Sequence, residues 1–119
     1  MKILVVDDDE FARSTFGAIL ARDHHDVTLL PGAETALDEL AEATFDVVIC
    51  DLKMPGISGL ELHEKIAREH PEVPVILTTG YITPAEEPLI ARTGAQLLTK
   101  PFGPSEVRAV LKKVLLQGS

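Results

Sequence analysis

The sequence predicts a three-layer α/β domain, in which a doubly wound, five-stranded parallel sheet lies between two layers formed by five helices. Five short apolar runs alternate with five segments of helical periodicity. The chain has 119 residues, 45% hydrophobic and 25% charged, which suits one globular domain but not two. We therefore expect a single domain over residues 1–119. Right-handed crossovers favour the strand order 2-1-3-4-5, with a ligand crevice beside the first and third strands.

Each predicted strand is a short apolar run, as expected for a parallel sheet covered on both faces. In chain order the runs are KILVV, DVTLL, DVVIC, PVILTT and AQLLT, at residues 2–6, 26–30, 46–50, 74–79 and 95–99. The only cysteine, Cys50, ends the third run. It cannot form an internal disulfide, and we interpret it as a small buried apolar residue.

The predicted helices carry apolar residues on one face and begin at residues that suit capping. The apolar face of the second helix comprises Ala33, Ala36, Leu37, Leu40 and Ala41. That of the fifth comprises Val107, Val110, Leu111, Val114 and Leu115. Ser58 and Glu61 form a capping box for the third helix, and Pro104 suits the first position of the fifth.

The fourth helix, within TPAEEPLIARTG, is predicted to be short because proline interrupts it. Thr83 and Glu86 would form a capping box at its start. Pro88 follows about one turn later, where proline removes a backbone hydrogen bond and costs about 3 kcal/mol. We expect this helix to begin near Pro88, or to have a frayed first turn, and to end at Gly94 in a left-handed cap.

Polar residues that end the predicted strands should gather at one edge of the sheet. Asp7 and Asp8 follow the first strand, Asp51 follows the third, Thr79 ends the fourth and Lys100 follows the fifth. Ligands of such sheets bind at the carboxyl ends of the strands. Clustered carboxylates repel one another, so we expect a hard divalent cation among them, Mg²⁺ or alternatively Mn²⁺. A metal, a lysine and a hydroxyl around one nucleophilic carboxylate would receive a phosphoryl group.

The segments VVDDDE, VVICDLKMPGISG, PVILTTG and LLTKPF, in this order and spacing, resemble the receiver domain of two-component response regulators. The resemblance spans nearly the whole chain and implies a flavodoxin-like fold and a phosphorylation-dependent signalling switch. Asp51 would accept a phosphoryl group from the phosphohistidine of a histidine kinase or a phosphotransfer protein. Asp7, Asp8, Asp51 and the backbone carbonyl of Lys53 would hold Mg²⁺.

The resemblance also implies how the switch would report phosphorylation. Lys100 would pair with Asp51 and then with the phosphoryl group, across a cis bond to Pro101, and Thr79 would move to a phosphoryl oxygen. The fourth helix, fifth strand and fifth helix would then change the face that meets an effector, an output domain or a second copy of the chain. Receivers commonly carry Tyr or Phe at the position of Leu97, so this chain lacks the ring of the usual relay. Lys53 and Tyr81 occupy positions that tune hydrolysis of the acyl phosphate in the family.

Composition excludes several other classes of function. A net charge of −8 argues against direct binding to nucleic acid or to an anionic membrane. No apolar run is long enough to span a membrane and no signal-peptide pattern opens the chain, so we expect a cytoplasmic protein. We expect no turnover enzyme, because the chain would only phosphorylate itself and slowly lose the group.

Two alternative functions fit the sequence less well. In a haloacid-dehalogenase-like phosphatase, Asp7 would be the nucleophile and Asp9 the acid–base. However, Phe11 stands where Thr or Val is expected, and no acidic pair follows Lys100. In a carrier of flavin mononucleotide, the acids after the first strand would repel the phosphate. The sequence leaves open whether the receiver stands alone or belongs to a larger regulator or hybrid kinase.

Overall fold

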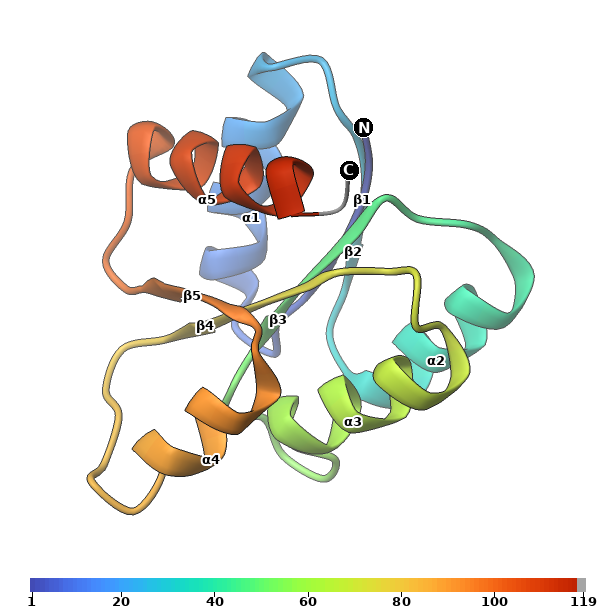
Figure 1. Ribbon diagram of the computed structural model, residues 1–119. Helices are drawn as coiled ribbons and strands as arrows, with labels where there is room; N and C mark the ends of the chain where they lie inside the picture. The colour runs from blue at the N-terminus through green and yellow to red at the C-terminus, as the bar shows by residue number, and fades with distance from the viewer. Residues whose placement is uncertain (118–119) are drawn as a thin grey trace.

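The computed structural model describes residues 1–117 and has three layers (Figure 1). Strands and helices alternate as β1 (Lys2–Val6), α1 (Glu10–Arg22), β2 (Asp26–Leu30), α2 (Ala33–Glu42), β3 (Val47–Asp51), α3 (Gly59–Glu69), β4 (Val75–Thr79), α4 (Glu87–Thr93), β5 (Gln96–Thr99) and α5 (Pro104–Gln117). The strands are parallel in the order β2-β1-β3-β4-β5, which confirms the predicted fold. Each predicted strand boundary lies within about one residue of the observed one.

Helices cover both faces of the sheet, with α1 and α5 on one face and α2, α3 and α4 on the other (Figure 1). Successive residues of a strand point to opposite faces, so the central strands supply two cores. One core contains Ile3, Val5, Val47, Ile49 and Ile76, and the other contains Leu4, Val6, Val48, Cys50 and Leu77. In Figure 1 the carboxyl ends of β4 and β5 lie at the left, and that of β3 lies at the lower left. The buried strands thus form a rigid base for the loops that follow them.

Cys50 is fully buried between these elements, which confirms its interpretation as a core residue. Burial, followed by the negative charges of Asp51 and Asp7, raises the pKa of the Cys50 thiol. The thiol therefore stays protonated at neutral pH and behaves as an apolar group.

The fourth helix is short, as predicted. It begins at Glu87 with Pro88 in its first turn and ends at Gly94, whose φ of 70° is left-handed. The capping box forms one turn earlier, because the Thr83 N–H donates to Glu86 Oε1 at 2.9 Å and the Glu86 N–H donates to Thr83 Oγ1 at 3.3 Å. The box therefore closes the turn that leads into α4, and Pro88 falls where a helix lacks backbone partners anyway.

The capping box of α3 is only half formed. Ser58 Oγ accepts a hydrogen bond from the Glu61 N–H at 3.3 Å, as predicted. The Glu61 carboxylate instead lies 3.5 Å from the Ser58 hydroxyl, rather than on the Ser58 N–H. At the start of α5, the Gly103 N–H donates to Glu106 Oε1 at 2.7 Å, next to the predicted first residue Pro104.

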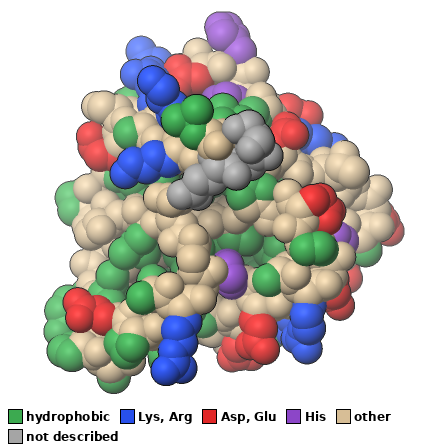
Figure 2. Space-filling model, in the orientation of Figure 1, with side chains coloured by type: hydrophobic (Ala, Val, Ile, Leu, Met, Phe, Trp, Pro, Cys, Tyr) green, Lys and Arg blue, Asp and Glu red, His purple; other side chains and the backbone are tan. Residues whose placement is uncertain are grey.

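The surface mixes both signs of charge with apolar side chains. Figure 2 shows hydrophobic side chains gathered at the lower left, over α4 and the segment before it, while acidic and basic side chains are scattered over this face. Exposed apolar residues of this part of the chain include Tyr81 and Leu89, which are 66% and 48% exposed. Among residues 1–117, no helix is long and apolar enough to cross a bilayer.

Candidate functional site

The strand register brings the predicted carboxylates together. Val6 of β1 lies beside Cys50 of β3, so the residues that follow them, Asp7 and Asp51, are neighbours at the carboxyl ends of the strands. Asp7 is 1% exposed and Asp51 is 8% exposed, whereas Asp8 is exposed. One carboxylate oxygen from each of these three residues lies within 4.8 Å of the other two. Such a cluster of negative charge requires nearby positive charge to be stable.

Lys100 supplies part of that positive charge. Its Nζ lies 3.1 Å from Asp7 Oδ2 and 3.4 Å from Asp51 Oδ2. The Lys100–Pro101 bond is cis, as expected, and the Lys100 N–H donates to the Thr79 carbonyl at 2.8 Å. Burial opposes the charged form of Lys100, but hydrogen bonds and charges from Asp7 and Asp51 outweigh it and raise the lysine pKa. The ammonium therefore bridges the two buried carboxylates.

Asp51 is held in an environment that disfavours its charge. Burial, followed by the charge of Asp7, raises the pKa of Asp51, while Lys100 and the N–H of Lys53 oppose this rise. The Lys53 N–H donates to Asp51 Oδ1 at 3.3 Å. A carboxylate that is incompletely compensated by its surroundings favours the approach of a cation and is more basic than an ordinary aspartate.

We expect Asp51 to make the metal-free protein less stable as the pH rises. Because its pKa is higher in the folded than in the unfolded state, the folded state binds more protons between the two values, and the free energy of unfolding falls with rising pH there. Asp51→Asn should therefore be more stable than the wild type at about pH 7, with the difference fading below about pH 4. Thermal unfolding of both proteins in EDTA, at several pH values across this range, measures the difference in their stability. An equal difference at every pH would assign the effect to packing instead of charge.

Thr79 occupies the predicted place at the end of β4, but its hydroxyl is engaged by its own loop. The side chain is 2% exposed, and the hydroxyl donates to the Tyr81 carbonyl at 2.9 Å and accepts from the Tyr81 N–H at 3.3 Å. The neighbouring Thr78 hydroxyl is buried and has no hydrogen-bond partner among the described residues. Thr79 must therefore release Tyr81 before its hydroxyl can donate to a group bound at Asp51.

The loop after β1 is held by hydrogen bonds from Arg13 and from its own backbone. Arg13 Nη1 donates to the Asp7 carbonyl at 2.7 Å. The Asp9 N–H donates to Asp7 Oδ1 at 2.9 Å, and the Asp9 carboxylate caps α1 by accepting from the Phe11 N–H at 3.0 Å. Of these donors, the Asp9 N–H is the one that binds the Asp7 carboxylate itself. For the Arg13 contact, the only sequence signal was an arginine one helical turn after the acids, and that spacing is common on helices.

Gly59, the last residue of DLKMPGISG, lies directly behind the acidic cluster. Its N–H donates to the Leu52 carbonyl at 3.0 Å. A Cβ at this position would collide with the Asp51 carbonyl oxygen and lie 2.7 Å from Leu52 Cα. Both neighbours are backbone atoms of the segment that carries Asp51, so only glycine fits here without moving that segment.

We therefore expect Gly59→Ala to destabilise the fold by about 1–3 kcal/mol, the usual effect of forcing an extra methyl into a packed site. Gly80→Ala is the matched control, because an added Cβ there would approach nothing closer than Lys100 Cβ at 4.0 Å. Urea unfolding of the two variants measures the difference. Equal stabilities would mean that the backbone around Asp51 moves aside at little cost.

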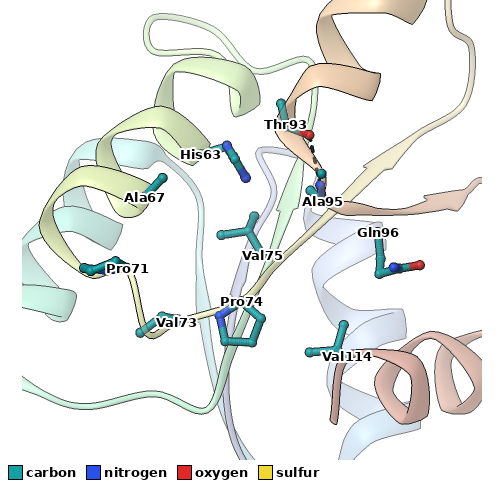
Figure 3. Close-up of a pocket in the computed structure, with 11 residues that line it drawn as sticks. His63, Ala67, Pro71, Val73, Pro74, Val75, Thr93, Ala95, Gln96 and Val114 are labelled. Atoms are coloured by element: carbon teal, nitrogen blue, oxygen red, sulfur yellow. Dashed lines mark hydrogen bonds between the residues drawn. The ribbon is translucent and has the colours of Figure 1, made fainter. Parts of the chain in front are cut away.

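The opposite end of the sheet has a cavity, but its lining lacks the carboxylates of the acidic cluster. This cavity, of about 220 Å³, lies near the amino ends of β4 and β5 and is shown in Figure 3. Apolar side chains such as Val75 and Val114 line it, together with His63, and the Thr93 hydroxyl accepts a hydrogen bond from the Ala95 N–H at 3.1 Å. No carboxylate lines this cavity. The candidate site is therefore the acidic cluster at the carboxyl ends of the strands.

Comparison with known proteins agrees with this geometry. The family model of the response regulator receiver domain matches residues 3–112. Response regulator protein FleR of Pseudomonas aeruginosa is 37% identical over 114 residues, which cover 95% of this chain and 24% of FleR. Transcriptional regulatory protein FixJ of Bradyrhizobium diazoefficiens is 30% identical over 119 residues, which cover 97% of this chain and 57% of FixJ. The chain thus spans only part of the length of these curated relatives.

Solved structures extend the similarity to the whole fold. Chemotaxis protein CheY4 of Vibrio cholerae superposes with a TM-score of 0.87 at 28% identity, covering 95% of this chain and 97% of CheY4. A CheY-like receiver domain protein of Methanospirillum hungatei gives a TM-score of 0.91 at 27% identity, covering 98% and 94% of the two chains. None of these matches supports a haloacid-dehalogenase-like phosphatase. The chain belongs to the response regulator receiver domain family, the phosphorylation-dependent switches of two-component signalling.

Proposed function

We propose that Asp51 is the phosphoacceptor of this receiver, with Thr79 and Lys100 as the side chains that bind the phosphoryl oxygens. The observation that supports this most strongly is the Lys100 ammonium, which lies within 3.4 Å of the Asp7 and Asp51 carboxylates. The Lys100 ammonium can therefore keep its contact with Asp7 and also bind a phosphoryl group formed on Asp51. Of these two acids, Asp51 lies at the end of β3. Strand β4, which ends in Thr79, separates β3 from β5, which Lys100 follows.

The same proposal assigns a metal site to Asp7, Asp8, Asp51 and the backbone carbonyl of Lys53. Receiver domains bind Mg²⁺ at an acidic pocket, and three carboxylate oxygens cluster here within 4.8 Å. All these donors are oxygens, which suits a hard cation such as Mg²⁺, with Mn²⁺ as a substitute. When bound, the cation would offset the charge of the carboxylates and of the incoming phosphoryl group.

Phosphoryl transfer then follows from the positions of the side chains. An Asp51 oxygen forms a bond to phosphorus as the bond to the phosphohistidine nitrogen breaks, and the leaving imidazole takes up a proton. Lys100 keeps its contact with Asp7 and offers its remaining N–H groups to the phosphoryl oxygens. Thr79 leaves the Tyr81 carbonyl and donates to one of these oxygens. The chain is a switch that carries the group and does not act as a turnover enzyme.

The proposed partners follow from the family. We infer that residues 1–119 form one receiver domain that takes its phosphoryl group from a histidine kinase or phosphotransfer protein in the cytoplasm. The face of α4, β5 and α5 would then control an effector or output domain, or form a homodimer. This face begins directly after the Thr79 loop, which supports its role as the element that changes.

Site mapping with acetyl phosphate tests the proposal. The chain is incubated with acetyl phosphate and Mg²⁺, and peptide mass spectrometry locates the added phosphoryl group. We expect modification of the peptide that contains Asp51, and none when EDTA removes the metal. Modification at another residue, or modification that survives EDTA, would contradict the assignment.

A further inference from the structure

Lys53 ties the loop of Asp51 to the segment that leads into α4. Its side chain is 51% exposed, and its Nζ lies 3.4 Å from Glu86 Oε1 and 5.6 Å from the centroid of the Tyr81 ring. Lys53 follows β3, whereas Tyr81 and Glu86 lie between β4 and α4. One cation therefore connects the loops that follow two neighbouring strands of the sheet at the candidate site.

Glu86 shares one carboxylate oxygen between Lys53 and the capping box. The same Oε1 accepts from the Thr83 N–H at 2.9 Å and from the Thr83 hydroxyl at 2.8 Å. These two bonds, and then Lys53, lower the pKa of Glu86, so the carboxylate is ionised at neutral pH. The position of Glu86 thus depends on both the capping box and the cation from the neighbouring loop.

Tyr81 links this pair to Thr79. Its carbonyl and N–H both bond to the Thr79 hydroxyl, and its ring lies beside the Lys53 ammonium. Contacts therefore run without a gap from the end of β4 to the first turn before α4. At Leu97 the chain has no aromatic ring that could carry this connection through β5. The Tyr81, Lys53 and Glu86 contacts offer another route.

We propose that phosphorylation of Asp51 draws the Lys53 ammonium away from Glu86, so that the charge of the phosphoryl group is coupled to the start of α4. Lys53 would be a phosphoryl-binding residue, and Glu86 a positioning residue that acts through it. The inference rests on Asp51 being the phosphoacceptor. A phosphoryl group carries about −1.5 to −2 charge, against −1 for a carboxylate, and so competes well for the cation.

The geometry favours this exchange. The Lys53 N–H already donates to Asp51 Oδ1 at 3.3 Å, so the backbone of Lys53 is fixed beside the place where the phosphoryl group would form. The ion pair with Glu86 is partly exposed to solvent, and pairs near the surface change an equilibrium by about fivefold at most. After losing the cation, Glu86 would be positioned by its bonds to Thr83 alone, so these bonds would open more often. The segment before α4 would then be held by fewer contacts and could rearrange with Thr79.

A double-mutant cycle with beryllofluoride, a mimic of the phosphoryl group, tests the exchange. Wild type, Glu86→Gln, Lys53→Gln and the double variant are titrated with beryllofluoride in Mg²⁺. Glu86→Gln keeps an oxygen for the Thr83 bonds but frees Lys53, so we expect beryllofluoride to bind about two- to fivefold more tightly. Lys53→Gln should weaken binding by a similar factor. In the Lys53→Gln background, Glu86→Gln should have no further effect.

The matched control is Glu87→Gln, which removes the same charge one residue along the chain. It measures the long-range effect of one fewer negative charge. Its affinity for beryllofluoride should change less than that of Glu86→Gln. Hydrogen exchange gives a second measurement, which beryllofluoride would not change if Lys53 and Glu86 only stabilised the fold. Beryllofluoride should speed exchange of the Thr83 N–H in the wild type but not in Lys53→Gln.

Two results overturn the inference. The first is additive effects of the two substitutions in the cycle, and the second is exchange of the Thr83 N–H that beryllofluoride leaves unchanged in the wild type. Both presuppose that the wild type binds beryllofluoride in Mg²⁺. A wild type that fails to bind contradicts the proposed function of Asp51 itself, and the inference falls with it.

Discussion

Asp51→Asn should lower the rate of phosphorylation by acetyl phosphate in Mg²⁺ by roughly 10³-fold or more, as removal of a nucleophile does elsewhere. Asparagine has nearly the same shape and can still accept the Lys53 N–H that now donates to Asp51 Oδ1. Its amide, however, carries no negative charge with which to attack phosphorus. Phosphate-affinity electrophoresis or intact-mass spectrometry over time gives the rate directly.

The matched control for this experiment is Asp38→Asn, since Asp38 is an exposed aspartate in α2. We expect it to be phosphorylated at the wild-type rate. The stability of Asp51→Asn at neutral pH, predicted above to exceed that of the wild type, shows independently whether the variant is folded. Undiminished labelling of Asp51→Asn would disprove the assignment. Label found on Asp7 would move the nucleophile to the residue that the phosphatase alternative requires.

The fold could be predicted because its signals are local and repeated. The central strands β1, β3 and β4 are almost fully buried and therefore read as apolar runs, and a parallel sheet needs a helix between successive strands. The fourth helix could be predicted to its first turn, because proline fixes its own backbone at Pro88, and Gly94 can adopt the left-handed conformation that ends a helix. The register then followed, and with it the approach of Asp7 to Asp51.

The contacts made by loop side chains could not be predicted in the same way. The Lys53–Glu86 pair joins residues of different loops, and the sequence spacing between them does not state which loops meet. The hydroxyl of Thr79 was placed at the right strand end, but its bond to the Tyr81 carbonyl depends on the path of the following loop. For Glu61, two acceptable partners lie within reach, and the sequence pattern does not distinguish the Ser58 hydroxyl from the Ser58 N–H.

Asp8→Asn should lower the affinity for Mg²⁺ at least tenfold, on the order of what loss of a metal partner costs in other sites. Asp8 is exposed and takes part in the acidic cluster, so replacing it removes a charged oxygen donor without opening a gap in the core. Mg²⁺ keeps several waters and uses few protein ligands, so each carboxylate contributes a large share of the attraction. Isothermal titration calorimetry with MgCl₂ measures the change, and phosphorylation at a fixed, low Mg²⁺ concentration should fall in parallel.

Asp9→Asn separates direct binding from a general effect of charge. Asp9 is the next residue along the chain, it is exposed, and asparagine can cap α1 as well as aspartate does. The two substitutions therefore remove the same charge from the same loop and preserve the helix start. A charge that acts on the cation only through solvent and salt should change its affinity by about twofold. If Asp8→Asn and Asp9→Asn weaken Mg²⁺ equally, Asp8 is not a ligand, and the acidic loop attracts the cation only through its summed charge.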